Sequence, residues 1–310
     1  MWFAGDVATA SRPSGDIIFT TYFSGLRDDH RRKVVPSDKR RFIEPWWRSL
    51  QRLPLQGVVF HNNLSAAFVR NHSTPRIRFE RVDAAAHYAR GLSLNDLRFF
   101  VYLAKLREWP DVRRVWLTDA RDVWVMRDPF TPMRDGVIYA GQNKEQVLPW
   151  GSPHAREAPE WCVPAFRRHR YERYLSAGLL GGATSPMLDF LNRTIAVLAE
   201  APRHANRNML AVNCVLLTHF APHGRLATSP AAPVQRECGL LNNESERNKS
   251  VWFVHKCLLP QDRKQGLAWR LPYGGLTSNW KAYAVGNMPR SRLRMAKAAG
   301  RGRRSRKPRA

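Results

Sequence analysis

Residues 112–124 read VRRVWLTDARDVW, a hydrophobic run that leads directly into two aspartates. The segment from Val115 to Thr118 is bulky and β-branched, which predicts a buried strand. Asp119 and Asp122 follow this strand at once. Because ligands of open α/β sheets bind just outside the carboxyl ends of the strands, the two carboxylates stand where a binding site is expected.

An amphipathic helix is predicted immediately before this strand, over residues 93–109 (SLNDLRFFVYLAKLREW). Ser93 is expected to cap the helix, with Asp96 three places further on. Pro110 is expected to end it. The predicted apolar face consists of Leu97, Phe100, Val101 and Ala104.

Strands and helices alternate along the rest of the chain. Further strands are predicted at Gly15–Gly25, 55–63, 74–83, Gly136–Gly141 and Ser250–Cys257, and residues 173–184 form a strand or a turn. Further helices are predicted at 39–53, where Pro45 starts or kinks the helix, at Ser185–Glu200 and at 206–220. A long loop, of the kind that often serves as a lid, is expected from Gln142 to Arg173. This alternation favours an α/β fold, with a mostly parallel central sheet flanked by helices.

The composition is that of a globular protein with an excess of positive charge. The chain has 310 residues, of which 44% are hydrophobic, enough for a large core. Residues 289–310 carry ten Lys or Arg and no acid, so we expect a basic disordered tail. The formal charge of +26 leaves +16 on residues 1–288. Such charge suits a nucleotide, a nucleic acid or an anionic membrane surface, and an Arg-rich proteome explains it equally well.

The four cysteines lack the paired short spacing of zinc ribbons. They are predicted to be buried free thiols, with a disulfide among the last three as the alternative. They stand at Cys162, Cys214, Cys238 and Cys257.

Two carboxylates at a strand end suit a divalent metal ion, which hard oxygen ligands and sometimes an imidazole can hold. Such an ion can neutralise a pyrophosphate leaving group. The plainer interpretation is that the acids cap turns or pair with Arg121 and Arg127, and for an isolated D-x-x-D motif that interpretation is favoured. Asp128 follows in the sequence RDPF.

The context of the motif changes this balance. Residues 95–130 (NDLRFFVYLAKLREWPDVRRVWLTDARDVWVMRDPF) resemble the segment of GT-A nucleotide-diphospho-sugar glycosyltransferases in which an Arg-bearing helix and a strand precede a D-x-D-type motif. The glycogenin-like and galactosyltransferase families share this order. The runs GDIIFTTYFSG, LSAGLLGG and VWFVHKC are similar to the base-binding strand, the donor-sugar strand and the late strand with a metal-binding His.

The resemblance implies a metal site and its neighbours. Asp119 would contact the ribose or the ion, and Asp122 would coordinate the ion. His255 would complete the coordination, Lys256 would touch a phosphate, and Arg98 would meet the donor sugar or the diphosphate.

The resemblance further implies the donor pocket and the class of reaction. Thr20, Thr21 and Tyr22 would meet the base and ribose, and Gly178 would face the donor sugar. Residues 1–288 would form a Rossmann-like GT-A catalytic domain that uses Mn²⁺ or Mg²⁺. The donor would be a UDP- or GDP-linked sugar, and the acceptor a glycan, protein or lipid.

Three features depart from the family pattern. The motif is D-x-x-D rather than D-x-D, and Ser176 stands where many relatives have Asn. The late Asp-Gln pair near the acceptor is missing, and the nearest polar residues are Asn208 and Asn213. No acceptor base stands out among Asp189, Glu157 and Glu160.

Two other functions compete with this one. A basic nucleic-acid-binding protein fits the charge, the 11 Trp and the tail, but the basic residues of the body are scattered and no binding motif is present. A metal-dependent nucleotidyl or phosphoryl transferase would use the same acids, although no P-loop accompanies them.

No apolar run reaches the roughly 18 residues of a membrane span, and the first residues lack a signal-peptide pattern. The chain is therefore expected to be cytoplasmic, or attached to a membrane surface through its basic tail, unless it is a fragment of a Golgi-type enzyme.

Overall fold

A computed structural model describes residues 12–28, 33–89, 91–147, 158–200, 206–229, 231–237 and 251–255. Some of the residues singled out in the sequence lie outside this part of the chain, namely Lys256, Glu157, Cys238, Cys257 and the basic tail 289–310. In the part that the structure describes, every helix is too short or too polar to cross a bilayer.

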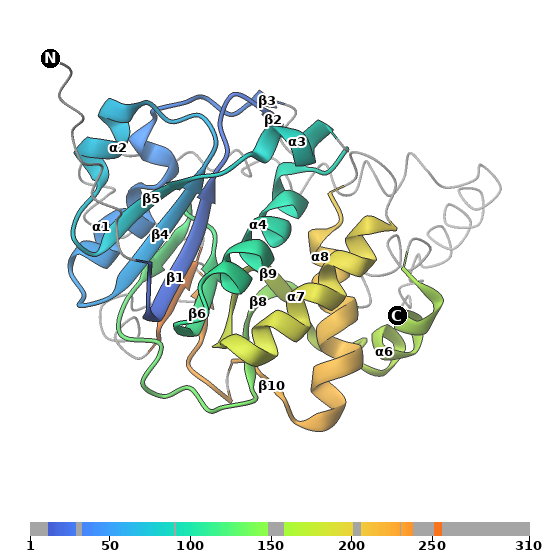
Figure 1. The fold of residues 1–310 in the computed structure, drawn as a ribbon. Coiled ribbons are helices and arrows are strands. Elements are labelled where there is room, and N and C mark those ends of the chain that lie inside the picture. The colour runs from blue at the N-terminus through green and yellow to red at the C-terminus, as the bar shows by residue number, and fades with distance from the viewer. Residues whose placement is uncertain are drawn as a thin grey trace, which may run out of the picture. The chain divides into compact units, whose positions relative to one another are not determined.

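The central element is a seven-stranded sheet in the order β10-β8-β9-β6-β1-β4-β5 (Figure 1). The strands are β1 Gly15–Tyr22, β4 Gln56–His61, β5 Ile77–Arg81, β6 Val112–Thr118, β8 Ile138–Gln146, β9 Arg173–Ala183 and β10 Leu226–Ala227. Only β9 runs antiparallel to its two neighbours, so the sheet is mostly parallel as the sequence predicts. Two short strands, β2 Arg27–Asp28 and β3 Lys33–Val34, form a separate ribbon.

Helices cover both faces of the sheet (Figure 1). They are α1 Glu44–Gln51, α2 Ala66–His72, α3 Ala84–Ala89, α4 Leu94–Glu108, α6 Val163–Arg168, α7 Thr184–Ala199 and α8 Asn208–Val215, with a π-helical turn at Leu216–Phe220 and 3₁₀ turns at Arg40–Phe42, Glu160–Cys162 and Ala221–His223. The alternating side chains of β1 show how the faces divide. Ile17 and Phe19 belong to the core beneath α4, α7 and α8, whereas Ile18 belongs to the core beneath α1 and α2.

Helix α4 has the predicted cap but a different buried face. The Ser93 hydroxyl accepts a hydrogen bond from the Asp96 N–H and donates one to the Asp96 carboxylate, which satisfies the start of the helix. The predicted apolar face is wrong at Ala104, which is exposed, and Phe100 is only half-buried. The helix buries a wider arc because both the sheet and α7 pack against it, and this arc contains Phe99, Tyr102, Leu103 and Leu106.

The loop expected from Gln142 to Arg173 is shorter than predicted, because β8 continues to Gln146 and α6 lies within the second half. Of the two alternatives for residues 173–184, the structure shows the strand, β9, in which Gly181 lies opposite Trp116. A Cβ at this position would come within 2.3 Å of the Trp116 ring, so the glycine makes room for the indole.

Cys162 and Cys214 form a disulfide, which contradicts the prediction of free thiols. The predicted alternative was also misplaced, because it did not include Cys162. Both residues are fully buried, and they join the turn before α6 to helix α8 across 52 positions of sequence. Spacing alone does not determine cysteine pairing, which explains the error.

We expect the Cys162→Ser, Cys214→Ser double variant to unfold at lower temperature than the parent. A cross-link across 52 residues stabilises by about 4 kcal/mol in the chain-entropy account. For a chain of this size that loss corresponds to a Tm lower by roughly 8–16 °C.

Differential scanning calorimetry measures the shift, and mass spectrometry of the alkylated, unreduced parent checks the bond. Recovery of the two cysteine peptides as separate alkylated species would contradict the pairing.

Candidate functional site

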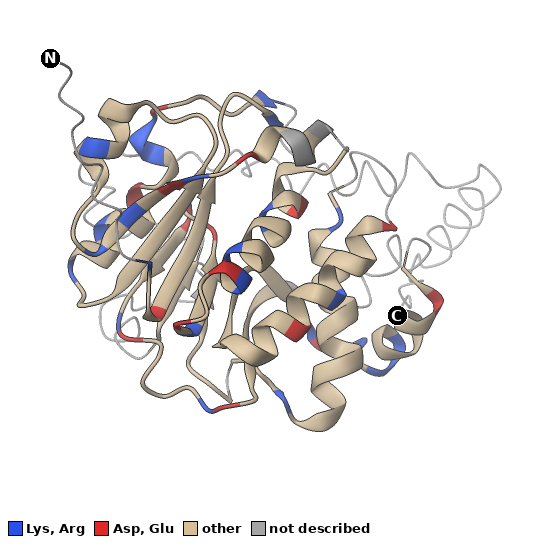
Figure 2. Ribbon diagram, viewed as in Figure 1, with Lys and Arg blue, Asp and Glu red and all other residues tan. Residues whose placement is uncertain are grey.

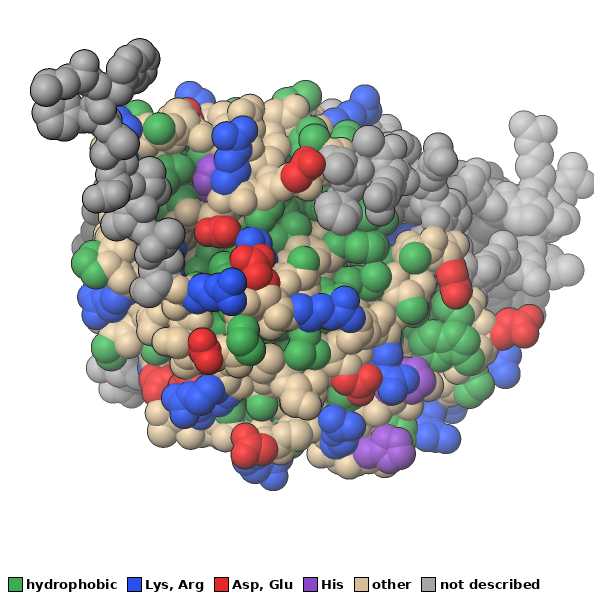
Figure 3. All heavy atoms as spheres, viewed as in Figure 1, with side chains coloured by type: hydrophobic (Ala, Val, Ile, Leu, Met, Phe, Trp, Pro, Cys, Tyr) green, Lys and Arg blue, Asp and Glu red, His purple; other side chains and the backbone are tan. Residues whose placement is uncertain are grey.

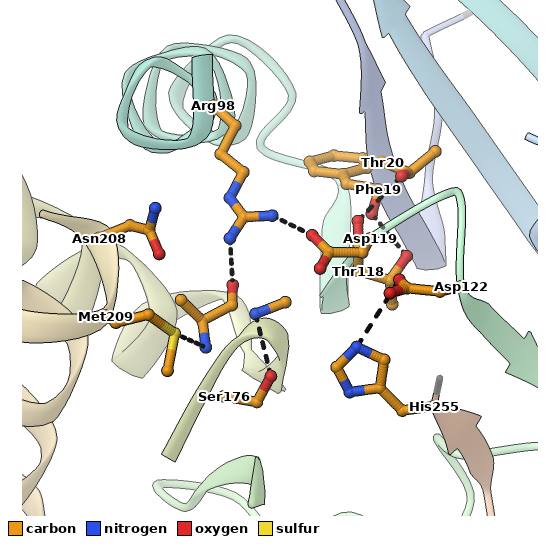
Figure 4. Close-up of polar contacts among 12 residues, drawn as sticks. Phe19, Thr20, Arg98, Thr118, Asp119, Asp122, Ser176, Asn208, Met209 and His255 are labelled. Atoms are coloured by element: carbon orange, nitrogen blue, oxygen red, sulfur yellow. Dashed lines mark hydrogen bonds and ion pairs between the residues drawn. The ribbon is translucent and has the colours of Figure 1, made fainter. Parts of the chain in front are cut away.

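A small second sheet brings two distant segments together. Strand β12 Phe253–His255 pairs with β11 Gln235–Glu237 and, antiparallel, with β7 Val123–Val125. The register places His255 opposite Val123, the residue that follows Asp122. The His255 Nε2 atom consequently lies 3.7 Å from an Asp122 carboxylate oxygen (Figure 4).

His255 is a buried imidazole without a hydrogen-bonding partner. Its side chain is 1% exposed, and neither ring nitrogen has a partner within the described structure. A buried polar group of this kind is costly unless something binds it. The imidazole faces the Asp122 carboxylate, which points to a ligand held between them.

One ligand atom each of Asp119, Asp122 and His255 lies within 4.8 Å of the other two. Opposite ligands of a divalent ion stand about 4.0–4.6 Å apart, because each bond is about 2.0–2.3 Å long. Two carboxylates and one imidazole form a donor set that suits Mn²⁺ or Mg²⁺. The spacing and chemistry of the three residues therefore fit a divalent metal ion after a small contraction.

Arg98 fixes the orientation of Asp119. Its guanidinium, 6% exposed on α4, donates to the Asp119 carboxylate and to the Ala177 carbonyl, the latter at 2.9 Å (Figure 4). Burial disfavours the charged guanidinium, but Asp119, together with Tyr102 and Asp96, outweighs this penalty and raises the pKa of Arg98. Arg98 thereby fixes the Asp119 carboxylate, one oxygen of which lies near the ligand atoms of Asp122 and His255.

Two threonines join the strand ends from which the site rises. The Thr20 hydroxyl donates to the Thr118 carbonyl at 2.8 Å, and the Thr118 hydroxyl donates to the Phe19 carbonyl at 3.2 Å. Thr20 is fully buried and does not line the pocket beside the aspartates. Its position is that of a structural support for Asp119.

A pocket adjoins the three candidate ligands. Most of the residues predicted from the sequence line it: Thr21, Tyr22, Arg98, Asp119 and Asp122. The Tyr22 hydroxyl donates to the Pro36 carbonyl at 2.6 Å, and its ring stacks on Phe42 at 5.4 Å. Burial raises the pKa of Tyr22. The tyrosine is thus a fixed wall of the pocket rather than a mobile one.

Among the polar residues that line the pocket, sequence reasoning missed Asp28, Asn95 and Arg121. Asn95 lies on α4 three positions before Arg98, and this helical spacing was a usable signal. Asp28 stands in a charged, turn-rich link, and nothing in the sequence around it signals a role in the pocket. The sequence suggests Arg121 only as an ion-pair partner of the neighbouring aspartates. In the structure its guanidinium lies over the Phe42 ring, 5.0 Å from the ring centroid.

Gly178 contacts Asp119 closely. The Asp119 N–H donates to the Gly178 carbonyl at 2.9 Å, and a Cβ on Gly178 would lie 2.2 Å from an Asp119 carboxylate oxygen. No residue with a side chain can occupy this position unless the carboxylate or the strand moves.

Other acids lie apart from this cluster. Asp128 accepts hydrogen bonds from Phe130 and Thr131 and so closes its own turn. Asp189 forms an ion pair with Arg193 on the exposed side of α7, and Glu160 opens the turn before α6.

Comparison with known proteins yields distant structural likenesses. No protein-family model matches the chain, and no curated protein matches its sequence. Among solved structures it is similar to the bifunctional glycosyltransferase WbbM in its apo form, with 11% identity and a TM-score of 0.48 over 79% of this chain and 46% of WbbM. It is also similar to an active-site mutant of LgtC, with 13% identity and a TM-score of 0.48 over 84% of this chain and 98% of that one. The chain thus spans about half the length of WbbM.

Replacing Gly178 with Ala should weaken Mn²⁺ binding at least tenfold, because the methyl group displaces a candidate ligand. Gly181→Ala is the matched control. Gly181 lies on the same strand as Gly178, but its added Cβ would meet the Trp116 ring instead of Asp119. Both changes overpack the protein, and we expect only the first to affect the metal. Electron paramagnetic resonance of free Mn²⁺ measures the affinity, and equal affinities in the two variants would contradict the assignment.

Proposed function

We propose that this chain is a metal-dependent glycosyltransferase that moves a sugar from a nucleotide-diphosphate donor to an acceptor. The observation that carries the proposal is the convergence of Asp119, Asp122 and the buried His255, whose ring nitrogens have no hydrogen-bond partner among the described residues, beside a pocket that Arg98 lines. The resemblance of residues 95–130 to GT-A glycosyltransferases supports the same reaction.

The three candidate ligands would hold Mn²⁺ or Mg²⁺. When bound, the ion supplies positive charge that stabilises the developing nucleoside diphosphate as the glycosidic bond breaks. Asp122 and His255 lie on either side of the same space, and Asp119 offers a carboxylate oxygen. In this arrangement both aspartates of the D-x-x-D motif would be metal ligands.

The remaining pocket residues would bind and orient the donor. Arg98 is poised to donate to a sugar hydroxyl or a phosphate oxygen while it holds Asp119 in place. Thr21 and Tyr22 would meet the base and ribose, and Gly178, which leaves space for the Asp119 carboxylate, would face the donor sugar. Lys256 would add a positive charge next to His255.

The donor is proposed to be a UDP- or GDP-linked sugar, and the acceptor a glycan, protein or lipid. The distribution of charge favours nucleic-acid binding less than it favours glycosyl transfer. Basic residues are spread over many elements in Figure 2, and on the face drawn in Figure 3 acidic and basic side chains alternate rather than forming one positive stripe.

Asp122→Ala should abolish Mn²⁺-dependent turnover of the nucleotide sugar and leave the fold intact. The side chain is 34% exposed, so its removal creates no buried cavity. Asp135→Ala is the matched control. This exposed carboxylate precedes β8 and so lies at the amino-terminal ends of the strands, whereas Asp122 follows the carboxyl end of β6.

Product analysis separates the competing reactions. Release of free sugar and nucleoside diphosphate fits glycosyl transfer to water, whereas release of a nucleoside monophosphate would favour phosphoryl chemistry. A panel of nucleotide sugars, tested with Mn²⁺ by thermal shift, identifies the donor. Full turnover by Asp122→Ala would refute the metal assignment.

Removal of residues 289–310 should leave turnover of the nucleotide sugar unchanged, because the proposed site lies within residues 20–256. The same truncation should remove any salt-sensitive retention on nucleic acid or on anionic vesicles. Loss of sugar transfer in the truncated protein would argue against a catalytic body with a separate basic tail.

A further inference from the structure

Strand β9 pairs irregularly with its neighbours where it passes the proposed site. It pairs with β6 from Leu179 to Ala183, and with β8 it places Leu175 opposite Gln142 but shifts register on both sides of that pair. The residues Leu175–Gly178 are nevertheless buried. Backbone N–H and C=O groups of this segment that face away from β8 therefore require other partners.

Asn213 on α8 supplies two of these partners. Its side-chain oxygen accepts from the Leu175 N–H at 2.7 Å, and its amide nitrogen donates to the Leu175 carbonyl at 2.9 Å. The amide group thus pairs with Leu175 as a residue of a neighbouring strand would. The same nitrogen donates to the Met209 carbonyl at 2.8 Å, which fixes the fully buried side chain to its own helix.

The contacts continue along the segment to the site (Figure 4). The Met209 sulfur accepts from the Ala177 N–H at 3.3 Å, and Arg98 donates to the Ala177 carbonyl. The next carbonyl, that of Gly178, accepts from the Asp119 N–H. Side chains of α8 therefore hold one end of a short backbone segment whose other end holds Arg98 and Asp119.

Helix α8 is itself fixed at both ends. The Asp96 carboxylate accepts from the Arg207 N–H at 3.1 Å, at the start of α8, where no side chain of the helix itself caps it. The disulfide to Cys162 anchors Cys214, the neighbour of Asn213. A helix held in this way can set the position of a strand.

We infer that Asn213 is a positioning residue, which sets the place of Leu175–Gly178 and through it the geometry of Arg98 and Asp119. This inference rests on the proposed function. A Cβ on Gly178 would collide with the Asp119 carboxylate, so a shift of the segment toward the carboxylate displaces it. Misplacement of a reacting group by about 1 Å can cost roughly 100-fold in rate.

Asn213→Ala and Leu198→Ala provide the test. Leu198 is a fully buried residue of α7 that does not line the pocket, and we expect its truncation to lower stability. We expect Asn213→Ala to lower kcat by roughly 10- to 100-fold, with a smaller change in the KM of the donor. Its Mn²⁺ affinity, measured without donor, should fall about tenfold. Leu198→Ala should keep both values within about twofold at a comparable loss of Tm.

Met209→Leu keeps the test decisive if Asn213→Ala does not fold. It conserves apolar volume and removes only the sulfur acceptor, so Tm should change little. We expect kcat and Mn²⁺ affinity to fall about fivefold, the effect of one lost hydrogen bond. Parent-like values in Met209→Leu, or equal values in Asn213→Ala and Leu198→Ala, would overturn the inference.

Asp122→Ala, assayed alongside, separates the two levels of failure. If Asp122→Ala is inactive but the Asn213 and Met209 variants keep the kcat and Mn²⁺ affinity expected of a merely structural change, only the positioning role is overturned. A fully active Asp122→Ala overturns the proposed function and the inference that rests on it.

Discussion

The site depends on one interaction, the buried ion pair between the Arg98 guanidinium and the Asp119 carboxylate. A charge taken out of water must be paired and hydrogen-bonded, or its burial is strongly destabilising. Arg98 meets this requirement through a carboxylate that follows β6 and a carbonyl of β9. The ion pair thus joins α4, β6 and β9 at one point. It also fixes the Asp119 carboxylate, so one interaction determines both local stability and the orientation of a candidate ligand.

Local patterns in the sequence predicted much of the framework. Val115 to Thr118 is a strand because its residues are bulky and buried, and Ser93 caps α4 because its hydroxyl reaches the Asp96 N–H. Both effects operate within a few residues of the chain, where sequence patterns are informative. The error at Ala104 has a tertiary cause. A helix packed against a sheet and a second helix buries more than one stripe, and periodicity alone does not reveal which residues the second partner covers.

Contacts between distant segments were harder to anticipate. His255 was proposed because of the order of motifs, but its register opposite Val123 results from the pairing of strands more than a hundred residues apart in the chain. The order of motifs relates Asn213 to the acceptor side, whereas in the structure its side chain pairs with the Leu175 backbone. Thr20 and Thr21 are adjacent in sequence, yet one is fully buried and the other lines the pocket. The alternation of side chains along a strand explains this difference, but the sequence does not state which face opens to solvent.

The Cys162–Cys214 bond gives this region a closed covalent path. The ring contains α6, β9, α7 and most of α8, so it includes the antiparallel strand that lies between β6 and β8. A protease that cuts the chain once inside this ring leaves a nicked molecule whose two parts stay joined through the sulfur atoms. The two halves of the sheet would therefore remain tethered after such a cut. Separation of the fragments would require a reductant as well as the cleaved peptide bond.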